Sequence, residues 1–313
     1  MSADRLAEVS DLFVVAAVLL YLFSMVGFAL ELAFGRARAD APAARAKVPV
    51  TVGGGDTGDA DAAVPAGVES PSWAPKAGVA ALALGWLGWA ANLAAIVTRG
   101  LSVDRWPWGN MYEFVVAICF AAVTTFLAIQ FRQNARFLGA FVMVTATLGL
   151  GFAVKVLYTA AGPVVPALNS YWVAIHVTAA ILASGLFILA GVAGILYLVR
   201  GDGLSRLPSR ADLERVAHRV IVLAFPVWTF AVIAGALWAD KAWGRYWGWD
   251  PKEVWAFITW VAYAAYLHAR VTAGWRGRAA TIVQLIAFAC LLFNLIGVNI
   301  FISGLHSYAD VSS

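Results

Sequence analysis

Apolar residues fall in eight long runs that are separated by short polar segments. The runs cover approximately residues 12–34, 77–98, 110–131, 137–158, 171–199, 216–239, 252–273 and 279–303. Each run reaches or exceeds the roughly 20 residues that an α-helix needs to cross a membrane. No alternating strand pattern competes with this interpretation. The pattern predicts an all-α, polytopic membrane helix bundle with about eight transmembrane helices.

The first apolar run and the segment after it define the expected domain organisation. Residues 12–34 are too long for a signal-peptide core and lack a small-residue cleavage site, so we expect a retained helix within residues 1–35. Residues 36–76 are dominated by alanine, glycine, proline and small polar residues, a composition typical of a flexible linker. The remaining runs form one membrane domain over residues 77–310.

The composition supports a membrane protein and argues against nucleic-acid binding and dithiol chemistry. Hydrophobic residues make up 62% of the chain and charged residues only 13%, whereas a soluble domain is close to half apolar. The net charge is +4, but the basic residues lie between the helices, so we expect no nucleic-acid partner. Cys119 and Cys290 lie inside apolar runs and form no CxxC pair, so this chain does not itself perform dithiol chemistry.

Basic residues are distributed unequally between the two sides of the bundle. Most of them lie in residues 36–76, 132–136, 200–219 and 270–278, which therefore face the cytoplasm. Both termini are then outside. The segment 243–255 is also outside, so we predict a multi-pass protein of the plasma membrane with this segment on its extracytoplasmic face.

That segment, "WGRYWGWDPKEVW", is unusually rich in aromatic residues. It is too aromatic for an ordinary loop, and too charged and glycine-rich for the middle of a membrane helix. Tryptophans near a membrane surface often serve only as anchors, but seven of the 14 tryptophans lie between residues 228 and 260, which anchoring does not require. The segment indicates a large, flat, apolar ligand.

The four histidines suggest what this ligand is. His176 and His306 lie near the outer ends of their helices, level with the aromatic segment. His268 lies sixteen residues after Lys252, or about 24 Å deeper at 1.5 Å per residue. His218 lies among arginines, and that setting already explains it. Imidazole is an axial ligand of haem iron, and tryptophan offers large faces to a porphyrin.

Simpler interpretations exist for several of these residues. A lone histidine at a helix end is often a polar residue that reaches the membrane surface. Asp250, directly before Pro251, is equally suited to cap a helix or to contact a ligand.

The residues 235–270, "GALWADKAWGRYWGWDPKEVWAFITWVAYAAYLHAR", resemble the WWD signature of haem-handling proteins. The resemblance is closest to the cytochrome c assembly family of the CcsA/ResC type in the system II pathway, some of whose members are labelled CcsB. The segments "NMYEF", "SYWVAIHV" and "NLIGVNIFISGLHSY" are also similar to this family. The resemblance covers roughly residues 77–310 and is weaker before them.

The family resemblance implies haem b as a transported substrate. Haem would cross the membrane within the protein and be presented outside to apocytochrome c, whose CxxCH thiols add to its vinyl groups. His176 and His306 would be the outer axial ligands, and His268 would bind haem at an inner site. The outer haem site would also include Trp243, Trp247, Trp249 and Asp250.

The same resemblance implies a subunit of a holocytochrome c synthase complex. Its second component would be a ResB/Ccs1-like membrane protein with a large extracytoplasmic domain, thought to supply the second ligand of the inner haem. A thioredoxin-like protein that keeps the client thiols reduced would act indirectly. No residue of this chain is expected to act as a catalytic nucleophile.

Two alternative functions are compatible with the helices alone. A b-type haem electron-transfer subunit acting on quinone would pair His218 with His268 and His176 with His306, but it would not need the aromatic segment. A solute transporter would show inverted repeats or polar residues at the midplane, and the sequence shows no repeat.

Overall fold

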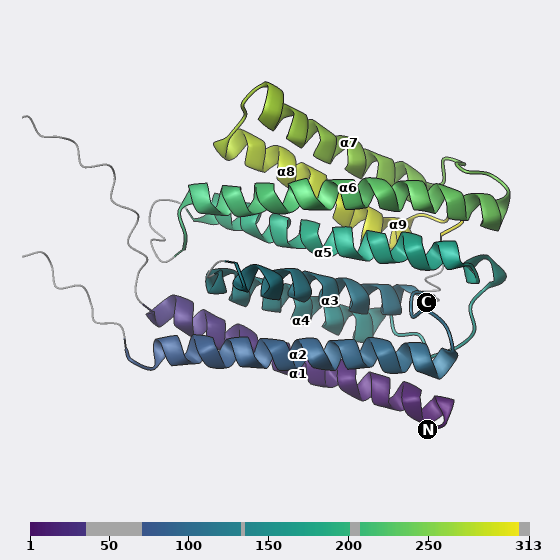
Figure 1. Cartoon of the computed structure of the whole chain (residues 1–313), viewed down its shortest axis with the longest axis horizontal. Helices are drawn as coiled ribbons and strands as arrows, with labels where there is room; N and C mark the ends of the chain where they lie inside the picture. The colour runs from purple at the N-terminus through teal and green to yellow at the C-terminus, as the bar shows by residue number, and fades with distance from the viewer. Residues whose placement is uncertain (36–70, 133–134, 201–206, 307–313) are drawn as a thin grey trace, which may run out of the picture.

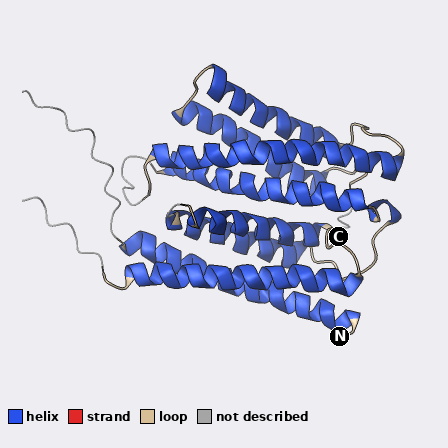
Figure 2. Ribbon diagram, in the orientation of Figure 1, coloured by secondary structure: helices blue, strands red, loops and turns tan. Residues whose placement is uncertain are grey.

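The computed structural model describes residues 1–35, 71–132, 135–200 and 207–306. In these residues the chain forms eight long helices and no strand (Figures 1 and 2). The long helices are α1 (Ala3–Phe34), α2 (Ala74–Val103), α3 (Met111–Gln130), α4 (Gly139–Val156), α5 (Tyr171–Val199), α6 (Arg210–Trp243), α7 (Pro251–Thr272) and α8 (Gly277–Leu292). Four short turns complete them: η1 (Arg136–Leu138), η2 (Pro166–Leu168), the π-helical η3 (Phe293–Gly297) and α9 (Val298–Phe301). The predicted all-α bundle is confirmed.

Seven of these helical segments in the described residues are long and apolar enough to cross a membrane. The exception is α7, which carries Lys252, Glu253, His268 and Arg270. Its 22 residues nevertheless extend about 33 Å, and it packs against α6 and α8. The chain is therefore a multi-pass membrane protein, and α7, the one long described helix that is not counted among these seven, lies at one edge of the bundle.

The helices are arranged as successive antiparallel pairs. Helix α1 packs along α2, α3 along α4, α5 along α6 and α7 along α8. Contacts of α1 with α4, α3 with α5 and α5 with α8 join one pair to the next (Figure 1). Small residues allow the close approach: a Cβ at Gly88 would lie 2.6 Å from the Tyr21 ring, so only glycine fits between α2 and α1 there.

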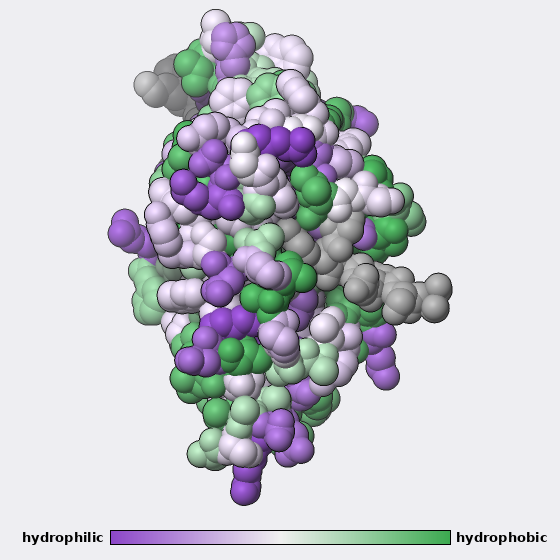
Figure 3. Space-filling model, turned by 90° about the vertical axis from the view of Figure 1, so that its right-hand side faces the viewer, coloured by the Kyte–Doolittle hydropathy of each residue, from purple (hydrophilic) through white to green (hydrophobic). Residues whose placement is uncertain are grey.

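One end of the bundle carries the aromatic segment singled out in the sequence. The α6–α7 loop and the end of α9 lie at this end, as does the start of α1 on the far side of the bundle from the loop (Figure 1). Figure 3 looks onto it and shows hydrophilic residues interspersed with hydrophobic ones. The predicted linker, residues 36–76, lies outside the described residues up to residue 70, and α2 already begins at Ala74.

Candidate functional site: an aromatic cavity with two histidines

The aromatic loop between α6 and α7 has firmly fixed ends. Gly244 ends α6 with φ 71°, a left-handed conformation that glycine adopts without steric cost. Asp250 and Glu253 form a capping box at the start of α7, with Pro251 in the first helical turn. Between these ends, Trp249 has φ 58°, and its side chain is 69% exposed.

Beside this loop lies a cavity with about 1090 Å³ of empty space, part of it open to solvent. We call it the aromatic cavity. Its walls come from α5, α6, α7, the π turn η3 and the loop before α3. The lining includes Trp108, Gly109, Asn110, Met111, Phe114, His176, Trp228, Gly235, Trp238, Trp243, Tyr246, Trp247, Lys252, Glu253, Asn294, Asn299 and His306. Its largely apolar and aromatic lining suits a large, flat ligand.

His176 enters the cavity from α5 and is held by α6. Its Nδ1 lies 2.7 Å from the carbonyl oxygen of Ala231. A carbonyl oxygen only accepts hydrogen bonds, so Nδ1 carries the hydrogen and Nε2 carries the lone pair of the neutral ring. Gly235 leaves room for the imidazole, because a Cβ there would lie 2.7 Å from Cε1 of His176. The backbone of α6 therefore fixes both the orientation and the tautomer of this histidine.

His306 enters from the segment after α9 and is held by Asp250. The Nδ1 of His306 lies 2.8 Å from Oδ2 of Asp250. A carboxylate that accepts from one imidazole nitrogen orients the ring and makes the other nitrogen a better metal ligand. Oδ1 of Asp250 accepts from the backbone N–H of Leu305 at 2.7 Å. One carboxylate thus joins the start of α7 to the segment that carries His306.

The charge of Asp250 is maintained by these contacts. Burial alone would raise the pKa of its carboxyl group. The hydrogen bonds from His306, Leu305 and Lys252 outweigh burial and lower this pKa below the ordinary value of 3.8. Asp250 is therefore ionised at neutral pH and remains an acceptor for His306.

Trp238 lies beside both imidazoles. Its ring stacks on His176 at 6.0 Å between centroids with an interplanar angle of 11°. It also meets His306 edge-on at 5.5 Å, and Trp243 meets His306 at 5.0 Å. The Trp238 side chain is 3% exposed, and its Nε1 donates to the carbonyl of Ala167 at 2.9 Å. The two histidines and two indoles form one continuous cluster.

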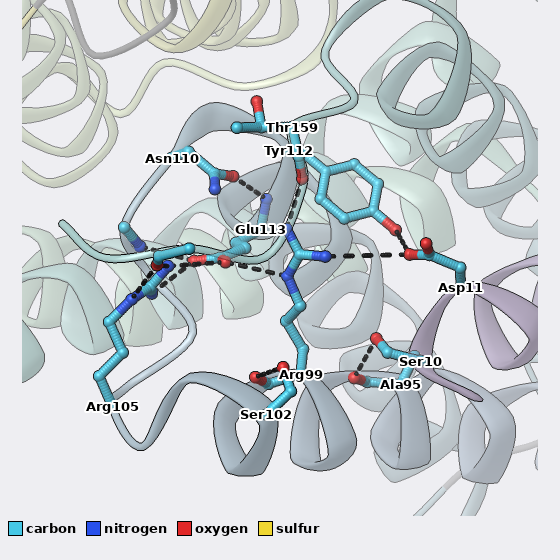
Figure 4. Close-up of polar contacts among 12 residues, drawn as sticks. Ser10, Asp11, Ala95, Arg99, Ser102, Arg105, Asn110, Tyr112, Glu113 and Thr159 are labelled. Atoms are coloured by element: carbon cyan, nitrogen blue, oxygen red, sulfur yellow. Dashed lines mark hydrogen bonds and ion pairs between the residues drawn. The ribbon is translucent and has the colours of Figure 1, made fainter. Parts of the chain in front are cut away.

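A buried ionic cluster fixes another wall of the cavity (Figure 4). The Glu113 carboxylate, 3% exposed, accepts from Arg99 Nε at 3.1 Å and from Arg105 at 2.9 and 3.0 Å. It also accepts from the backbone N–H of Gly109 at 2.7 Å. Asn110 caps α3 by accepting from the N–H of Glu113 at 2.9 Å. These bonds hold Trp108 to Met111, which form this wall.

Comparison with known proteins identifies the family. The family model described as Cytochrome C assembly protein matches residues 108–306, which is more than half of the chain. The chain belongs to this cytochrome c assembly family. The matched range begins at the first cavity residue, Trp108, and ends at the last one, His306.

Individual relatives agree with this assignment. The chain is similar to cytochrome c biogenesis protein CcsA of Trieres chinensis, with 32% identity over 69% of this chain and 81% of the relative. CcsA of Synechococcus elongatus is 32% identical over 75% of this chain and 87% of the relative. CcsA of Chlamydomonas reinhardtii is 35% identical over 68% of this chain and 64% of the relative. This member of the cytochrome c assembly family is therefore a CcsA-type cytochrome c biogenesis protein.

One solved structure has a similar fold. The cytochrome c haem lyase CcmF matches with a TM-score of 0.61 and 16% sequence identity. The match covers 94% of this chain but only 47% of CcmF. At this identity the similarity concerns the arrangement of helices alone, and this assembly protein spans about half of the CcmF chain.

Within this member of the family, most of the predicted outer residues lie together. His176, His306, Trp243 and Trp247 line the aromatic cavity. Asp250 caps α7 and bonds to His306 from behind, without lining the cavity. Trp249 is largely exposed and does not line it either.

The other two histidines of this assembly protein, His268 and His218, lie elsewhere. His268 is exposed near the other end of α7, and its Nδ1 lies 3.3 Å from Thr272 Oγ1 in the next turn of the same helix. His218 is half-buried on α6, with its Nδ1 3.4 Å from the Tyr266 hydroxyl. Each of these two imidazoles therefore has a different hydroxyl group as its hydrogen-bond partner.

Sequence reasoning missed several residues of the cavity. Trp238 was part of the noted concentration of tryptophans, five residues before Trp243, but no pattern set it apart from its neighbours. Trp108 and Asn294 come from segments far away in sequence. Their Nε1 and Oδ1 atoms are buried without a hydrogen-bond partner in the described residues. Only the tertiary structure reveals these polar atoms.

Proposed function

We propose that this chain carries haem b across the membrane and presents it to apocytochrome c on the extracytoplasmic face. There it would act as a subunit of a cytochrome c synthase complex. The observation that carries this proposal is the presence of His176 and His306 in one aromatic cavity. Each imidazole donates from Nδ1, to Ala231 and Asp250 respectively, so each has Nε2 as its metal-binding nitrogen.

The described residues fit haem by their chemistry. Imidazole nitrogen is an axial ligand of haem iron. Trp238, Trp243 and Trp247 supply aromatic faces for a porphyrin. The buried N–H of Trp108 and the ammonium of Lys252 are donors suited to ligand carboxylates. The cavity thus combines metal ligands, apolar surface and cationic or donor groups in one place.

The chain's role in thioether attachment would be positional. Two imidazoles shield the iron and influence its reduction potential, and the tryptophans hold the apolar edge of the ligand. The cavity is partly open, so a client CxxCH segment can approach from this side. Bringing thiol and vinyl together in a fixed orientation is by itself a large rate effect. No side chain of this protein need form a covalent intermediate.

The inner site would be built around His268. This histidine is exposed on α7, the one long helix of the described residues that is not among the seven candidate membrane spans. An ionisable residue within a membrane helix indicates a functional site. We propose that haem first binds there, with a second ligand from a ResB/Ccs1-like partner that has a large extracytoplasmic domain. A thioredoxin-like protein would keep the client thiols reduced.

The experiment that tests this proposal is haem spectroscopy of the purified chain, alone and with its partner. His176→Ala and His306→Ala are expected to alter the reduced spectrum at the aromatic cavity, with recovery on addition of imidazole. Both should abolish holocytochrome c formation in cells. If wild type and both variants carry the same stoichiometric b-type spectrum, the two histidines are not ligands and the proposal is wrong.

The electron-transfer alternative gains no support from the described residues. It requires His218 and His268 to face each other as a second ligand pair. Instead, His218 bonds to Tyr266 and His268 to Thr272. No specific observation favours that function over haem delivery.

A further inference from the structure

The π turn η3 gives Lys252 an unusual partner. At Phe293–Gly297 the helical bonding of the α8 segment changes to the π pattern. Such turns are rare and often occur at functional sites. The Nζ of Lys252, from the first turn of α7, donates to the carbonyl oxygen of Asn294 at 2.7 Å. The ammonium is thereby held at the wall of the aromatic cavity, which both residues line.

The nearby carboxylates are already occupied. Glu253 accepts from the backbone N–H groups of Gly248 and Asp250 at 2.8 and 3.0 Å. Asp250 accepts from Leu305 and His306. In the described residues the ammonium of Lys252 donates only to the neutral carbonyl of Asn294. It has three N–H donors, and a charge at such a wall is stabilised by an opposite charge.

A second donor at the cavity has no partner. Trp108, on the loop held by Glu113, has its Nε1 buried without an acceptor in the described residues. Indole nitrogen is only a donor, and a buried donor without an acceptor costs about 1–3 kcal/mol. A ligand with acceptor oxygens would relieve this cost. The cavity wall therefore has more N–H donors than the described residues use.

We propose that Lys252 recognises a carboxylate of the molecule that the aromatic cavity binds. The ligand is then a flat, apolar molecule with at least one anionic edge, oriented with that edge toward α7 and the π turn. The inference rests on the proposed function, under which the carboxylates are the haem propionates. Lys252 would thus determine which edge of the ring points to the solvent opening.

A purely structural role for Lys252 makes a different prediction. If the ammonium only stabilises the π turn, its removal should affect every cavity ligand equally. If it recognises a carboxylate, its removal should affect only ligands that have one. Haem and haem dimethyl ester share the ring and the iron but differ in this charge, so they separate the two roles.

The experiment is a titration of the full purified chain with haem and with haem dimethyl ester. The variants are Lys252→Gln, Lys252→Arg and, as a matched control, Lys241→Gln. Lys241 has a side chain that is 64% exposed, pairs with Asp240 and does not line the cavity. Binding is measured from the absorption spectrum, and thermal unfolding verifies that each variant is folded.

We expect Lys252→Gln to weaken haem binding about 10- to 100-fold, the range for loss of one charge-assisted hydrogen bond. It should leave ester binding unchanged. Wild type should bind the ester about as weakly as Lys252→Gln binds haem, and Lys252→Arg should recover part of the affinity. Lys241→Gln should behave as wild type with both ligands.

Three other results have distinct meanings. Equal weakening of both ligands by Lys252→Gln would mean that Lys252 only supports the cavity. Unchanged binding of both would mean that it contributes nothing to recognition. Either result overturns this inference and leaves the proposed function intact. If the wild-type chain binds neither ligand, the proposed function fails, and the inference fails with it.

Discussion

The two histidines of the aromatic cavity are held differently from His268, which lies at the other end of the bundle. At the end with the aromatic loop, His176 is fixed by Ala231 of a neighbouring helix and His306 by Asp250, which is 56 residues away in sequence. At the other end, the hydrogen bond of His268 within the described residues is to Thr272, one turn along its own helix, and the His268 residue is exposed. The cavity histidines are fixed by tertiary hydrogen bonds, and among the described residues His268 shows no hydrogen bond to another helix.

The difference indicates which site this chain can complete alone. A histidine held by a partner from another element has a defined rotamer and tautomer before any ligand binds. An exposed histidine acquires such definition only from another molecule. The aromatic cavity should therefore bind ligand in the isolated chain, whereas a site at His268 should depend on a partner. Four substitutions test this contrast.

The largest effect is expected for Glu113→Gln, which breaks the ionic cluster behind one cavity wall. Arg99 would remain buried with reduced compensation, and breaking a buried ion pair costs about 3–5 kcal/mol. Thermal unfolding in detergent measures the loss. Arg215→Gln is the control, because its pair with Asp212 is half exposed and such pairs contribute about 0–1 kcal/mol. Equal stability of the two variants would contradict the structural role of Glu113.

Asp250→Asn should lower the stability of the fold less than Glu113→Gln does, and its main effect should be on ligand binding. Asparagine still caps α7, but it cannot supply the carboxylate that orients His306. Loss of such a partner typically lowers metal affinity about 10- to 100-fold. Haem titration measures the effect, and no change in affinity would show that His306 does not need this carboxylate.

The same carboxylate predicts a pH dependence of stability. Because its folded pKa lies below 3.8, it stabilises the fold fully above that value and loses this contribution as pH falls through the lowered pKa. Acid unfolding of wild type should show this contribution, and Asp250→Asn should lack it.

Gly235→Ala should displace the His176 imidazole. Its effect should be smaller than that of Asp250→Asn and larger than that of His268→Ala. The new Cβ would lie 2.7 Å from the imidazole, and overpacking of this kind costs about 1–3 kcal/mol. Gly151→Ala is the matched control, since a Cβ there meets nothing within 4 Å and alanine favours a helix over glycine. The first variant should bind haem more weakly and the second as wild type. Equal binding by the two would mean that His176 can move without loss.

His268→Ala should have the smallest effect on the isolated chain. An exposed substitution away from packed contacts usually changes stability by less than about 0.5 kcal/mol. The spectrum of haem at the aromatic cavity should stay unchanged, while haem delivery in the complete complex should fall. A changed spectrum in the isolated chain would show that the two ends are not independent.

Hydrophobic pattern was sufficient to predict the helices but not the cavity. The eight runs correspond to the eight long helices, since burial in a membrane requires long apolar stretches whatever the packing. The ends of α6 were predicted at 216 and 239 but lie at Arg210 and Trp243, because polar capping residues extend a helix beyond its apolar part. The π turn has no apolar signature and was not predicted.

The candidate site, too, could be predicted from the sequence only in part. Residue type and position relative to the membrane led to His176 and His306, and the family resemblance led to Trp243 and Trp247; all four line one cavity. The roles of Trp249 and His268 remain predictions. Trp238 and Lys252 could not be selected from sequence, because their part in the cavity depends on which neighbours the fold brings to them. Residue type and the family resemblance indicated the chemistry, and only the packing of the helices shows which residues line the same cavity.

The π turn also constrains how this chain can change over generations. A π turn amounts to one extra residue within a helix. Because the turn absorbs the extra residue, the helical segments before and after it keep their orientation. Deleting one residue between 293 and 297 would restore the regular helix and leave the segment that carries Asn299 and His306 close to its place. It would remove the turn whose Asn294 carbonyl holds Lys252, so selection for that contact would retain the extra residue.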